Sequence, residues 1–210
     1  MFITFEGSEG SGKTSQILPL ERTLKDAGYN VLTTREPGGT PIGDRVREIL
    51  FDFKNTDMHP RTEILLFQAS RAQHVEQIIK PYLEKGGVVI CDRYADSTLA
   101  YQGYGYQQDI EQLRDLVNFA TCGLRPDLTI FVDVDVEVGL RRRVLAGKLN
   151  RLDAYTVAFY ERVRQGYYEL LRLDPERWVI IDGNRSFEQV RVDIYQVVLE
   201  RLQQASSYRE

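Results

Sequence analysis

Cysteine, histidine and long apolar runs are scarce in this chain of 210 residues, and each scarcity excludes a class of protein. Two cysteines, Cys91 and Cys122, are too few for a disulfide-stapled secreted domain, and Cys91 lies in an apolar run where we expect a buried thiol. The two histidines, His59 and His74, have no partner at metal-ligand spacing, so we interpret both as structural or surface residues. No apolar stretch approaches the ~20 residues of a membrane span. A strand-like run from Phe2 onward leaves no room for a signal peptide, so we expect a cytoplasmic protein without membrane contact.

An excess of positive charge is also absent. The chain has 27 Lys and Arg against 31 Asp and Glu, a net charge of −4, which argues against nucleic acid as a partner because phosphate backbones favour basic surfaces. A hydrophobic content of 42% is ordinary for a soluble protein. The simplest organisation is one domain, residues 1–210, with a core of full size.

Short apolar runs alternate with segments of helical spacing along the whole chain. The predicted strands are 2–5, 30–34, 88–91, 128–132 and 178–181. The predicted helices are 15–27, 42–51, 62–84, 109–119, 136–145, 154–173 and 187–202, with Pro81 kinking or ending the third and a polar tail over 203–210. This alternation predicts an α/β fold with a five-stranded parallel sheet flanked by helices on both faces. Ligands of such folds bind beyond the carboxyl ends of the strands, so the residues after each strand are the candidates for a site.

The first predicted strand runs into a phosphate-binding P-loop. The segment fits G-x-x-x-x-G-K-[ST] as Gly7-Ser8-Glu9-Gly10-Ser11-Gly12-Lys13-Thr14. Its backbone N–H groups and the following helix N-terminus are suited to phosphate oxygens. We expect Lys13 to reach the β- and γ-phosphates of a nucleoside triphosphate and the Thr14 hydroxyl to bind Mg²⁺. Glu9 is unusual in an anion-binding loop: it is either a solvated surface charge or an acceptor for a sugar hydroxyl of a second substrate.

Candidate residues also follow the second and third predicted strands. Arg35 and Glu36 either pair with each other or serve the site, and Arg47 either is solvated or faces the same cleft. Asp92 is placed to be an Mg²⁺ partner and Arg93 to bind phosphate, unless the two form an internal ion pair.

Three further groups could meet a base or a phosphoryl group. Phe67 and Arg71, spaced i, i+4, could stack on and pair with a base, or be a core phenylalanine beside a surface arginine. Tyr101 and Gln102 offer a ring and an amide to a base edge. Residues 143–154 resemble a mobile lid whose arginines could neutralise a transferring phosphoryl group, the alternative being a basic, solvated helix end.

These motifs, taken in order, resemble the thymidylate kinase family of P-loop nucleoside monophosphate kinases. The resemblance runs from residue 2 to about 198. It is carried by Phe5-Glu6-Gly7 before the P-loop, Arg35-Glu36-Pro37-Gly38-Gly39-Thr40, the pair Phe67 and Arg71, Asp92-Arg93-Tyr94, Ala100-Tyr101-Gln102-Gly103 and Arg125-Pro126-Asp127-Leu128.

The resemblance implies a P-loop NTPase fold with a short lid, a homodimer, and transfer of phosphate from Mg²⁺-ATP to dTMP. It implies that Glu9 binds the 3′-hydroxyl of dTMP and that Asp92 acts through Mg²⁺. The implied contacts to the rest of dTMP are stacking by Phe67, a base oxygen held by Arg71, the acceptor phosphate held by Arg47 and Arg93, and a base and sugar lining of Thr98, Tyr101 and Gln102.

The lid departs from the common family pattern. Ala146 precedes its glycine, where the family often has arginine, and Asn150 and Arg151 follow. Gly10 after Glu9 leaves Lys13 as the only base in the P-loop, which resembles the bacterial type with catalytic arginines on the lid. Arg143 and Arg151 are the candidates, with Lys148 as a partial substitute.

Two rival functions fit parts of the sequence. Another nucleotide or nucleoside kinase on the same scaffold would differ in the shape of its base pocket. A P-loop switch or regulatory ATPase with a protein partner would need a residue that orients water, and none stands out. A nucleic-acid motor is disfavoured by the acidic balance.

Overall fold

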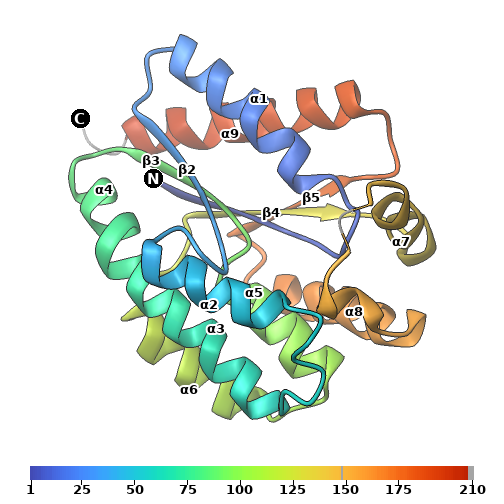
Figure 1. Cartoon of the computed structure of the whole chain (residues 1–210). Helices are drawn as coiled ribbons and strands as arrows, with labels where there is room; N and C mark the ends of the chain where they lie inside the picture. The colour runs from blue at the N-terminus through green and yellow to red at the C-terminus, as the bar shows by residue number, and fades with distance from the viewer. Residues whose placement is uncertain (148, 208–210) are drawn as a thin grey trace.

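The computed structural model describes residues 1–147 and 149–207, and a parallel sheet of five strands lies at the centre of this part of the chain (Figure 1). The strands are β1 (Phe2–Glu6), β2 (Val31–Arg35), β3 (Val88–Asp92), β4 (Leu128–Asp133) and β5 (Trp178–Asp182). Their order across the sheet is β2-β3-β1-β4-β5. β1 therefore lies in the middle, and its register sets Phe5 beside both Asp92 of β3 and Ile130 of β4.

Helices cover both faces of the sheet, as expected for buried parallel strands. The α-helices are α1 (Lys13–Asp26), α2 (Pro41–Phe51), α3 (Pro60–His74), α4 (Lys80–Glu84), α5 (Ala95–Thr98), α6 (Ile110–Thr121), α7 (Val136–Leu145), α8 (Val157–Leu173) and α9 (Phe187–Ser207). Two π-helical segments, η1 (Val75–Ile79) and η2 (Leu99–Gly105), and a 3₁₀ turn, η3 (Arg151–Ala154), complete the set in the described residues. Figure 1 shows α1 and α9 above the sheet and α3, α6 and α8 below it.

Successive residues of a strand point to opposite faces of the sheet and pack into different clusters of the core. Ile3 and Phe5 of β1 pack with residues of α1 and α9, whereas Phe2 packs on the opposite face with Val75 of η1. The second face continues into an aromatic cluster in which Phe131 of β4 packs with α8. Burial on both faces explains why the central strand β3 begins with the continuous apolar run Val88-Val89-Ile90-Cys91 rather than an alternating one.

The prediction of five parallel strands with helices on both faces is confirmed. The helix predicted over 62–84 continues through Pro81. Proline has no N–H to donate to the preceding turn, and the wider turns of η1 directly before it accommodate that loss. The predicted polar tail is wrong for residues 203–207, which continue α9, and residues 208–210 lie outside the described chain. Residues 95–105, for which no element was predicted, form α5 and η2.

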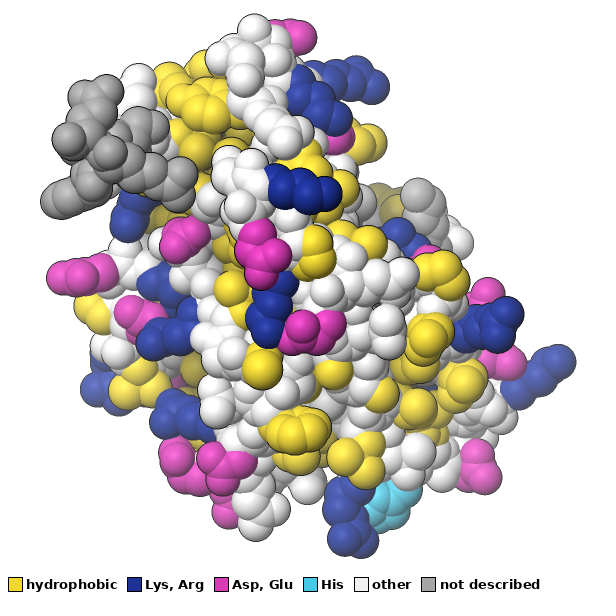
Figure 2. All heavy atoms as spheres, turned by 90° about the vertical axis from the view of Figure 1, so that its left-hand side faces the viewer, with side chains coloured by type: hydrophobic (Ala, Val, Ile, Leu, Met, Phe, Trp, Pro, Cys, Tyr) yellow, Lys and Arg dark blue, Asp and Glu magenta, His cyan; other side chains and the backbone are white. Residues whose placement is uncertain are grey.

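One face of the molecule carries large apolar side chains at its surface. α3 packs against both α2 and α6, and Ile49 in α2, Leu65 in α3 and Phe119 in α6 are 47%, 56% and 86% exposed. Figure 2 shows the left-hand side of Figure 1, where hydrophobic side chains gather in the lower part of the surface. None of the helices in residues 1–147 and 149–207 combines the length and apolar character needed to cross a bilayer.

Candidate functional site

The P-loop wraps closely around the end of β1 because its glycines adopt conformations that other residues avoid. Gly7 and Gly10 have φ angles of 144° and 71°. A Cβ on Gly10 would lie 1.9 Å from the carbonyl oxygen of Gly139 in α7, so a larger residue would push α7 away. The loop enters α1 at Lys13, and the N–H groups of that first turn, which have no partner within the helix, are suited to an anion.

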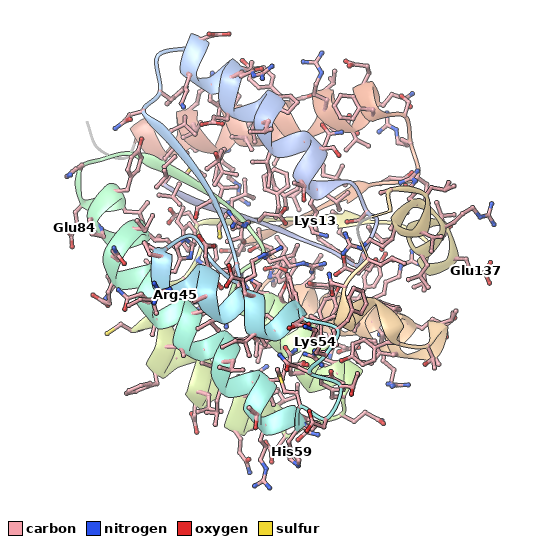
Figure 3. All side chains as sticks on the ribbon, viewed as in Figure 1. Lys13, Arg45, Lys54, His59, Glu84 and Glu137 are labelled. Carbon is pink, nitrogen blue, oxygen red and sulfur yellow. The ribbon has the colours of Figure 1, made fainter. Side chains whose placement is uncertain are left out.

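The ammonium group of Lys13 is held by oxygens of its own loop. It donates to the carbonyls of Gly7 at 2.9 Å and Ser8 at 3.0 Å and to the hydroxyl of Ser11 at 3.0 Å. Burial, reinforced by the nearby charge of Arg93, lowers the pKa of Lys13 to about 8. Figure 3 shows Lys13 near the middle of the molecule, far from the peripheral Glu84, His59 and Glu137. A cation buried beside a glycine loop is placed to bind phosphate oxygens.

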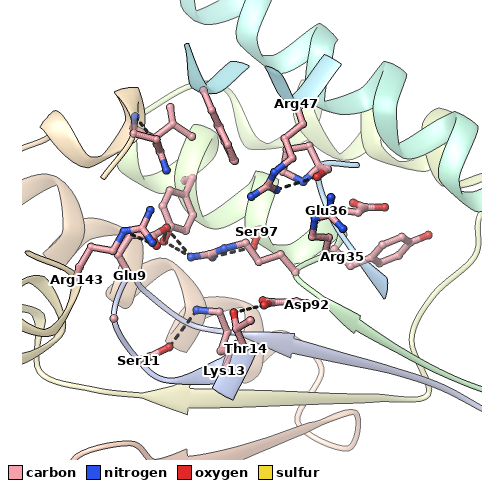
Figure 4. Close-up of a pocket in the computed structure, with 18 of the residues that line it drawn as sticks. Glu9, Ser11, Lys13, Thr14, Arg35, Glu36, Arg47, Asp92, Ser97 and Arg143 are labelled. Carbon is pink, nitrogen blue, oxygen red and sulfur yellow. Dashed lines mark hydrogen bonds and ion pairs between the residues drawn. The ribbon is translucent and has the colours of Figure 1, made fainter. Parts of the chain in front are cut away.

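Thr14 and Asp92 bring two oxygen ligands together beside Lys13 (Figure 4). The Thr14 hydroxyl donates to the Asp92 carboxylate over 2.5 Å. No group of three or more His, Cys, Asp and Glu side chains that could hold a metal occurs in the described part of the chain. A metal here would take one or two protein oxygens and complete its shell with phosphates and water, which is the donor set that Mg²⁺ prefers.

Glu9, the acidic residue of the P-loop, faces cations rather than solvent. Its Oε1 accepts from Nη2 of Arg93 at 2.7 Å and from the Tyr101 hydroxyl at 3.2 Å, and its Oε2 lies 4.0 Å from Nε of Arg143. Burial alone would raise the pKa of Glu9, but the charges of Arg93, Lys13 and Arg143 outweigh burial and lower it. The interpretation of Glu9 as a solvated surface charge is therefore wrong.

Arg93 joins the P-loop to the opposite wall of the site. It adopts a positive φ of 67°, which is strained for a residue with a side chain. Its guanidinium donates to the Gly7 carbonyl at 2.9 Å and to the Tyr101 hydroxyl at 3.0 Å, besides its contact with Glu9. The alternative of an ion pair with the preceding aspartate does not occur, since Arg93 pairs with Glu9 instead.

A single cleft of about 580 Å³ collects most of the predicted site residues. This volume lies within the range of small-molecule sites. The predicted residues that line it are Glu9, Gly10, Ser11, Gly12, Lys13, Thr14, Arg47, Phe67, Arg71, Asp92, Arg93, Thr98, Tyr101, Gln102 and Arg143. Gly7, Ser8 and Arg151 are not part of the lining; the two loop residues instead present carbonyls to Lys13.

Arg71 is 2% exposed, so the alternative of a surface arginine is wrong. It donates to Oε2 of Glu36 at 2.7 Å, to the Thr98 hydroxyl at 2.9 Å and to the Tyr94 carbonyl at 2.9 Å. The other oxygen of Glu36 lies 3.0 Å from Nδ1 of His74, which confirms His74 as a structural residue. This network holds the edge of the Arg71 guanidinium against the cleft, beside the half-buried Phe67.

Arg35 and Arg47 stand on one wall of the cleft (Figure 4). The proposed pairing of Arg35 with its neighbour Glu36 is wrong, because Arg35 contacts Asp44 at 3.0 Å. Arg47 donates to the Pro37 carbonyl at 2.9 Å and is not a solvated charge. Burial and the nearby Arg35 together lower the pKa of Arg47 to about 10. A partly buried arginine beside a second, exposed one favours an anionic ligand.

The two arginines predicted to act from a lid occupy different places. Arg143 in α7 lines the cleft within ion-pair distance of Glu9. Arg151 in η3 donates instead to Oε2 of Glu63, in α3, at 2.5 Å. Lys148, the third predicted lid cation, lies outside the described residues.

Several cleft residues were not predicted as ligands. Two of them are Arg142 and Ser97, and the Ser97 hydroxyl donates to the buried Glu6 at 2.6 Å. Ser97 stands four residues after Arg93, and that spacing was the available signal. Arg142 adjoins Arg143 in a run of arginines, but nothing local indicated that it donates to a backbone carbonyl after β5, at 2.8 Å.

Comparison with known proteins gives a consistent result. The family model described as thymidylate kinase matches residues 5–194. A curated thymidylate kinase of Thermomicrobium roseum is 50% identical over 95% of this chain and 94% of its own length. One from Roseiflexus castenholzii is 47% identical over 94% and 92%. A crystal structure of thymidylate kinase from Ehrlichia chaffeensis superposes with a TM-score of 0.76 at 37% identity, covering 94% of this chain and 98% of that one.

Proposed function

The chain belongs to the thymidylate kinase family, and on that premise we propose how its cleft carries out the family's reaction. The protein phosphorylates dTMP to dTDP with ATP, a step of dTTP synthesis. The assignment of individual residues to this reaction, the metal, the assembly and the location in the cell are parts of the proposal.

The P-loop side of the cleft is assigned to ATP. Residues 7–14 supply backbone N–H groups to the phosphates, and Lys13 neutralises charge between the β- and γ-phosphates. Thr14 and Asp92 are the residues that would hold Mg²⁺, which, when bound, withdraws charge from the phosphate oxygens.

The opposite side of the cleft is assigned to dTMP. Phe67 stacks on the base, and Arg71 donates to a base oxygen. Glu9 accepts from the sugar 3′-hydroxyl, and Arg47 and Arg93 hold the acceptor phosphate. The remaining residues assigned to the base and sugar are Thr98, Tyr101 and Gln102.

Positioning and charge neutralisation account for the catalysis. The acceptor phosphate is already an anion and needs no strong general base, so the protein must align it with the γ-phosphoryl group and compensate the charge of the transition state. Arg143 is assigned this role, because it lines the cleft whereas Arg151 is engaged by Glu63. Closure of the lid, residues 143–154, would exclude water, the competing acceptor.

The single observation that carries the proposal is the position of Arg93. It contacts the P-loop through Gly7 and Glu9 and the opposite wall through Tyr101, so a phosphate bound by its guanidinium would stand between donor and acceptor sites. A P-loop switch protein has no use for a second phosphate site facing its first.

The test is ADP release from Mg²⁺-ATP with and without dTMP, dUMP, dCMP, dGMP and AMP. We expect strong stimulation by dTMP with dTDP as product, and loss of turnover on chelation of Mg²⁺ by EDTA that excess Mg²⁺ restores. Slow hydrolysis indifferent to every acceptor would contradict the proposal and favour a regulatory ATPase. Full turnover in EDTA would contradict the assignment of Mg²⁺ to the reaction.

We also propose that the protein is a homodimer that pairs through the surface of α2, α3 and α6. The exposed Leu65 lies on the central helix of the three, with Ile49 and Phe119 on its neighbours, and a surface of this kind suits a self-complementary contact. Phe119→Glu should shift the mass measured by light scattering from dimer to monomer. A wild-type protein that is monomeric at micromolar concentration would contradict the assignment.

A cytoplasmic location is proposed from the cysteines. Cys91 and Cys122 are both free thiols, and Cys91 is completely buried. Free thiols fit a reducing compartment. A fluorescent fusion confined to the cell envelope would contradict this location.

A further inference from the structure

A buried carboxylate, Glu63, stands behind the base side of the cleft. It is 1% exposed. Its Oε1 accepts from Nε2 of Gln102 at 3.1 Å, and its Oε2 accepts from Nη2 of Arg151 at 2.5 Å and from the Tyr106 hydroxyl at 3.3 Å. Burial of a charge is costly unless partners satisfy it, and here they come from η2, the lid and the segment after η2.

Glu63 determines which way the Gln102 amide is turned. A carboxylate paired with a guanidinium accepts hydrogen bonds and donates none, so Gln102 must present its NH₂ group to Glu63. The carbonyl oxygen of the amide is then directed away from Glu63. Gln102 lines the cleft beside Arg71 and Tyr101, so an acceptor is the group it offers to a ligand there.

We propose that Glu63 is a positioning residue that sets base selectivity by fixing the Gln102 amide with its carbonyl toward the base. This inference rests on the proposed function, since it concerns the same dTMP site. Thymine and uracil carry an N–H at ring position 3, which can donate to that carbonyl. Cytosine has an unprotonated ring nitrogen at this position, so two acceptors would face each other without a proton between them.

Arg151 takes part in the same arrangement from the lid. Besides its bond to Glu63, its Nε donates to the Leu50 carbonyl at the end of α2 at 2.9 Å. The guanidinium therefore ties η3 to α2 and α3 while it balances the Glu63 charge. Without Arg151 the carboxylate would be buried without its cation, and its hold on Gln102 would change. Arg151 is thus a positioning residue as well.

The test compares kcat/KM for dTMP, dUMP and dCMP in the wild type and in Glu63→Gln. The new amide can donate as well as accept, so the Gln102 amide is released to either orientation. We expect the dTMP to dCMP ratio to fall about tenfold, the effect of one hydrogen bond, mainly through KM for the monophosphate. The dTMP to dUMP ratio should not change, since both bases carry the ring N–H, and KM for ATP should not change either.

Glu76→Gln is the matched control. It makes the same chemical change at a side chain that is 60% exposed and pairs with Lys80 outside the cleft. It should keep all three ratios. A Glu63→Gln enzyme whose activities toward dTMP and dCMP are unchanged, or fall in equal proportion, would show a structural role only and overturn the inference.

Two further variants test whether Glu63 acts through Gln102 and together with Arg151. In a Gln102→Ala background, Glu63→Gln should no longer alter the dTMP to dCMP ratio; a remaining change there would place the effect elsewhere. Arg151→Leu should also lower the dTMP to dCMP ratio. Because Arg151 is less buried than Glu63, this variant tests the inference if Glu63→Gln does not fold. A wild-type enzyme that does not phosphorylate dTMP would overturn the proposed function. A wild type that selects dTMP while these variants keep its selectivity would overturn this inference alone.

Discussion

The guanidinium of Arg93 donates a hydrogen bond to the carboxylate of Glu9 over 2.7 Å, joining the end of β3 to the P-loop. The two residues are 84 positions apart in sequence, and the Tyr101 hydroxyl contacts both. Each partner therefore holds the other in the cleft. A change at either one should affect the acceptor side more than the binding of ATP.

Arg93→Ala should lower kcat/KM for dTMP by a factor on the order of 10³, the loss seen when one donor to a developing charge is removed. Arg93→Lys should fall between this variant and the wild type, because it keeps the charge but loses the planar fork that can bind phosphate through two nitrogens. Steady-state kinetics measures both, with circular dichroism as the check on folding. Near-normal turnover of the alanine variant would remove Arg93 from the site.

Glu9→Ala should raise KM for dTMP about tenfold, with a much smaller change in KM for ATP, because a sugar hydroxyl loses its acceptor. The same variant assayed with 3′-deoxy-dTMP should show little further loss, since that substrate has no hydroxyl to donate. An equal rise of KM for dTMP and for ATP would contradict the contact of Glu9 with the sugar. An equal effect of Glu9→Ala on the KM values of dTMP and 3′-deoxy-dTMP would contradict it as well.

The activity should depend on pH through Lys13. Its pKa of about 8 lies below the ordinary value of 10.5, so the free enzyme loses this cation as pH rises through 8. We expect kcat/KM for ATP to fall about tenfold per pH unit above that point. In Lys13→Arg, which stays charged, the fall should disappear at a lower overall activity. A wild-type profile that is flat to pH 9.5 would contradict this.

The stability should depend on pH through Glu6. Burial, with a smaller contribution from Asp96, raises the pKa of Glu6 to about 7 from its ordinary value of 4.5. The unfolded chain therefore ionises Glu6 before the folded one does. Stability from this residue is fully present below pH 4.5 and is lost as pH rises toward and through 7. The largest expected loss is roughly 3 kcal/mol.

Urea unfolding of the wild type and Glu6→Gln at pH 5 and pH 8 measures this difference. The wild type should lose stability relative to the variant at the higher pH, since the variant cannot ionise. Glu76→Gln, changed at an exposed position, should follow the wild type. Parallel behaviour of wild type and Glu6→Gln would mean that Glu6 ionises normally in the folded protein.

The features that the sequence revealed are local ones. A strand buried on both faces is a continuous apolar run, and β1 to β5 lie within one residue of their predicted ends. The P-loop is also local, since glycine spacing and the flanking strand and helix define it. Thr14 and Asp92 were each assigned to Mg²⁺ from their own local context, the P-loop and the end of a buried strand. Their contact depends on β3 lying beside β1, an order that the alternation of elements does not give.

The features that stayed hidden depend on distant partners. Nothing near Glu36 indicates that it pairs with Arg71 and His74, 35 and 38 positions away, rather than with Arg35. Arg151 and Glu63 are 88 positions apart, so spacing could not separate a lid cation that meets the phosphate from one that meets a buried acid. Residues 99–105 lack a helical apolar period because π turns do not repeat every 3.6 residues, and the single α-helical stretch before them, residues 95–98, is too short to show one.

The π-helical segment η2 makes the lining of the cleft sensitive to chain length. Tyr101 and Gln102 lie in this segment, where each turn holds more residues than an α-helix does. Deletion of a single residue between Leu99 and Gly105 would let the segment return to an ordinary helix, which would keep the residues on either side nearly in register but change the direction of side chains within the segment. Tyr101 and Gln102 would then present other faces to the ligand while β1, β3 and the P-loop kept their places. Single-residue insertions and deletions are therefore a route by which this scaffold can acquire a new substrate while keeping its phosphate chemistry.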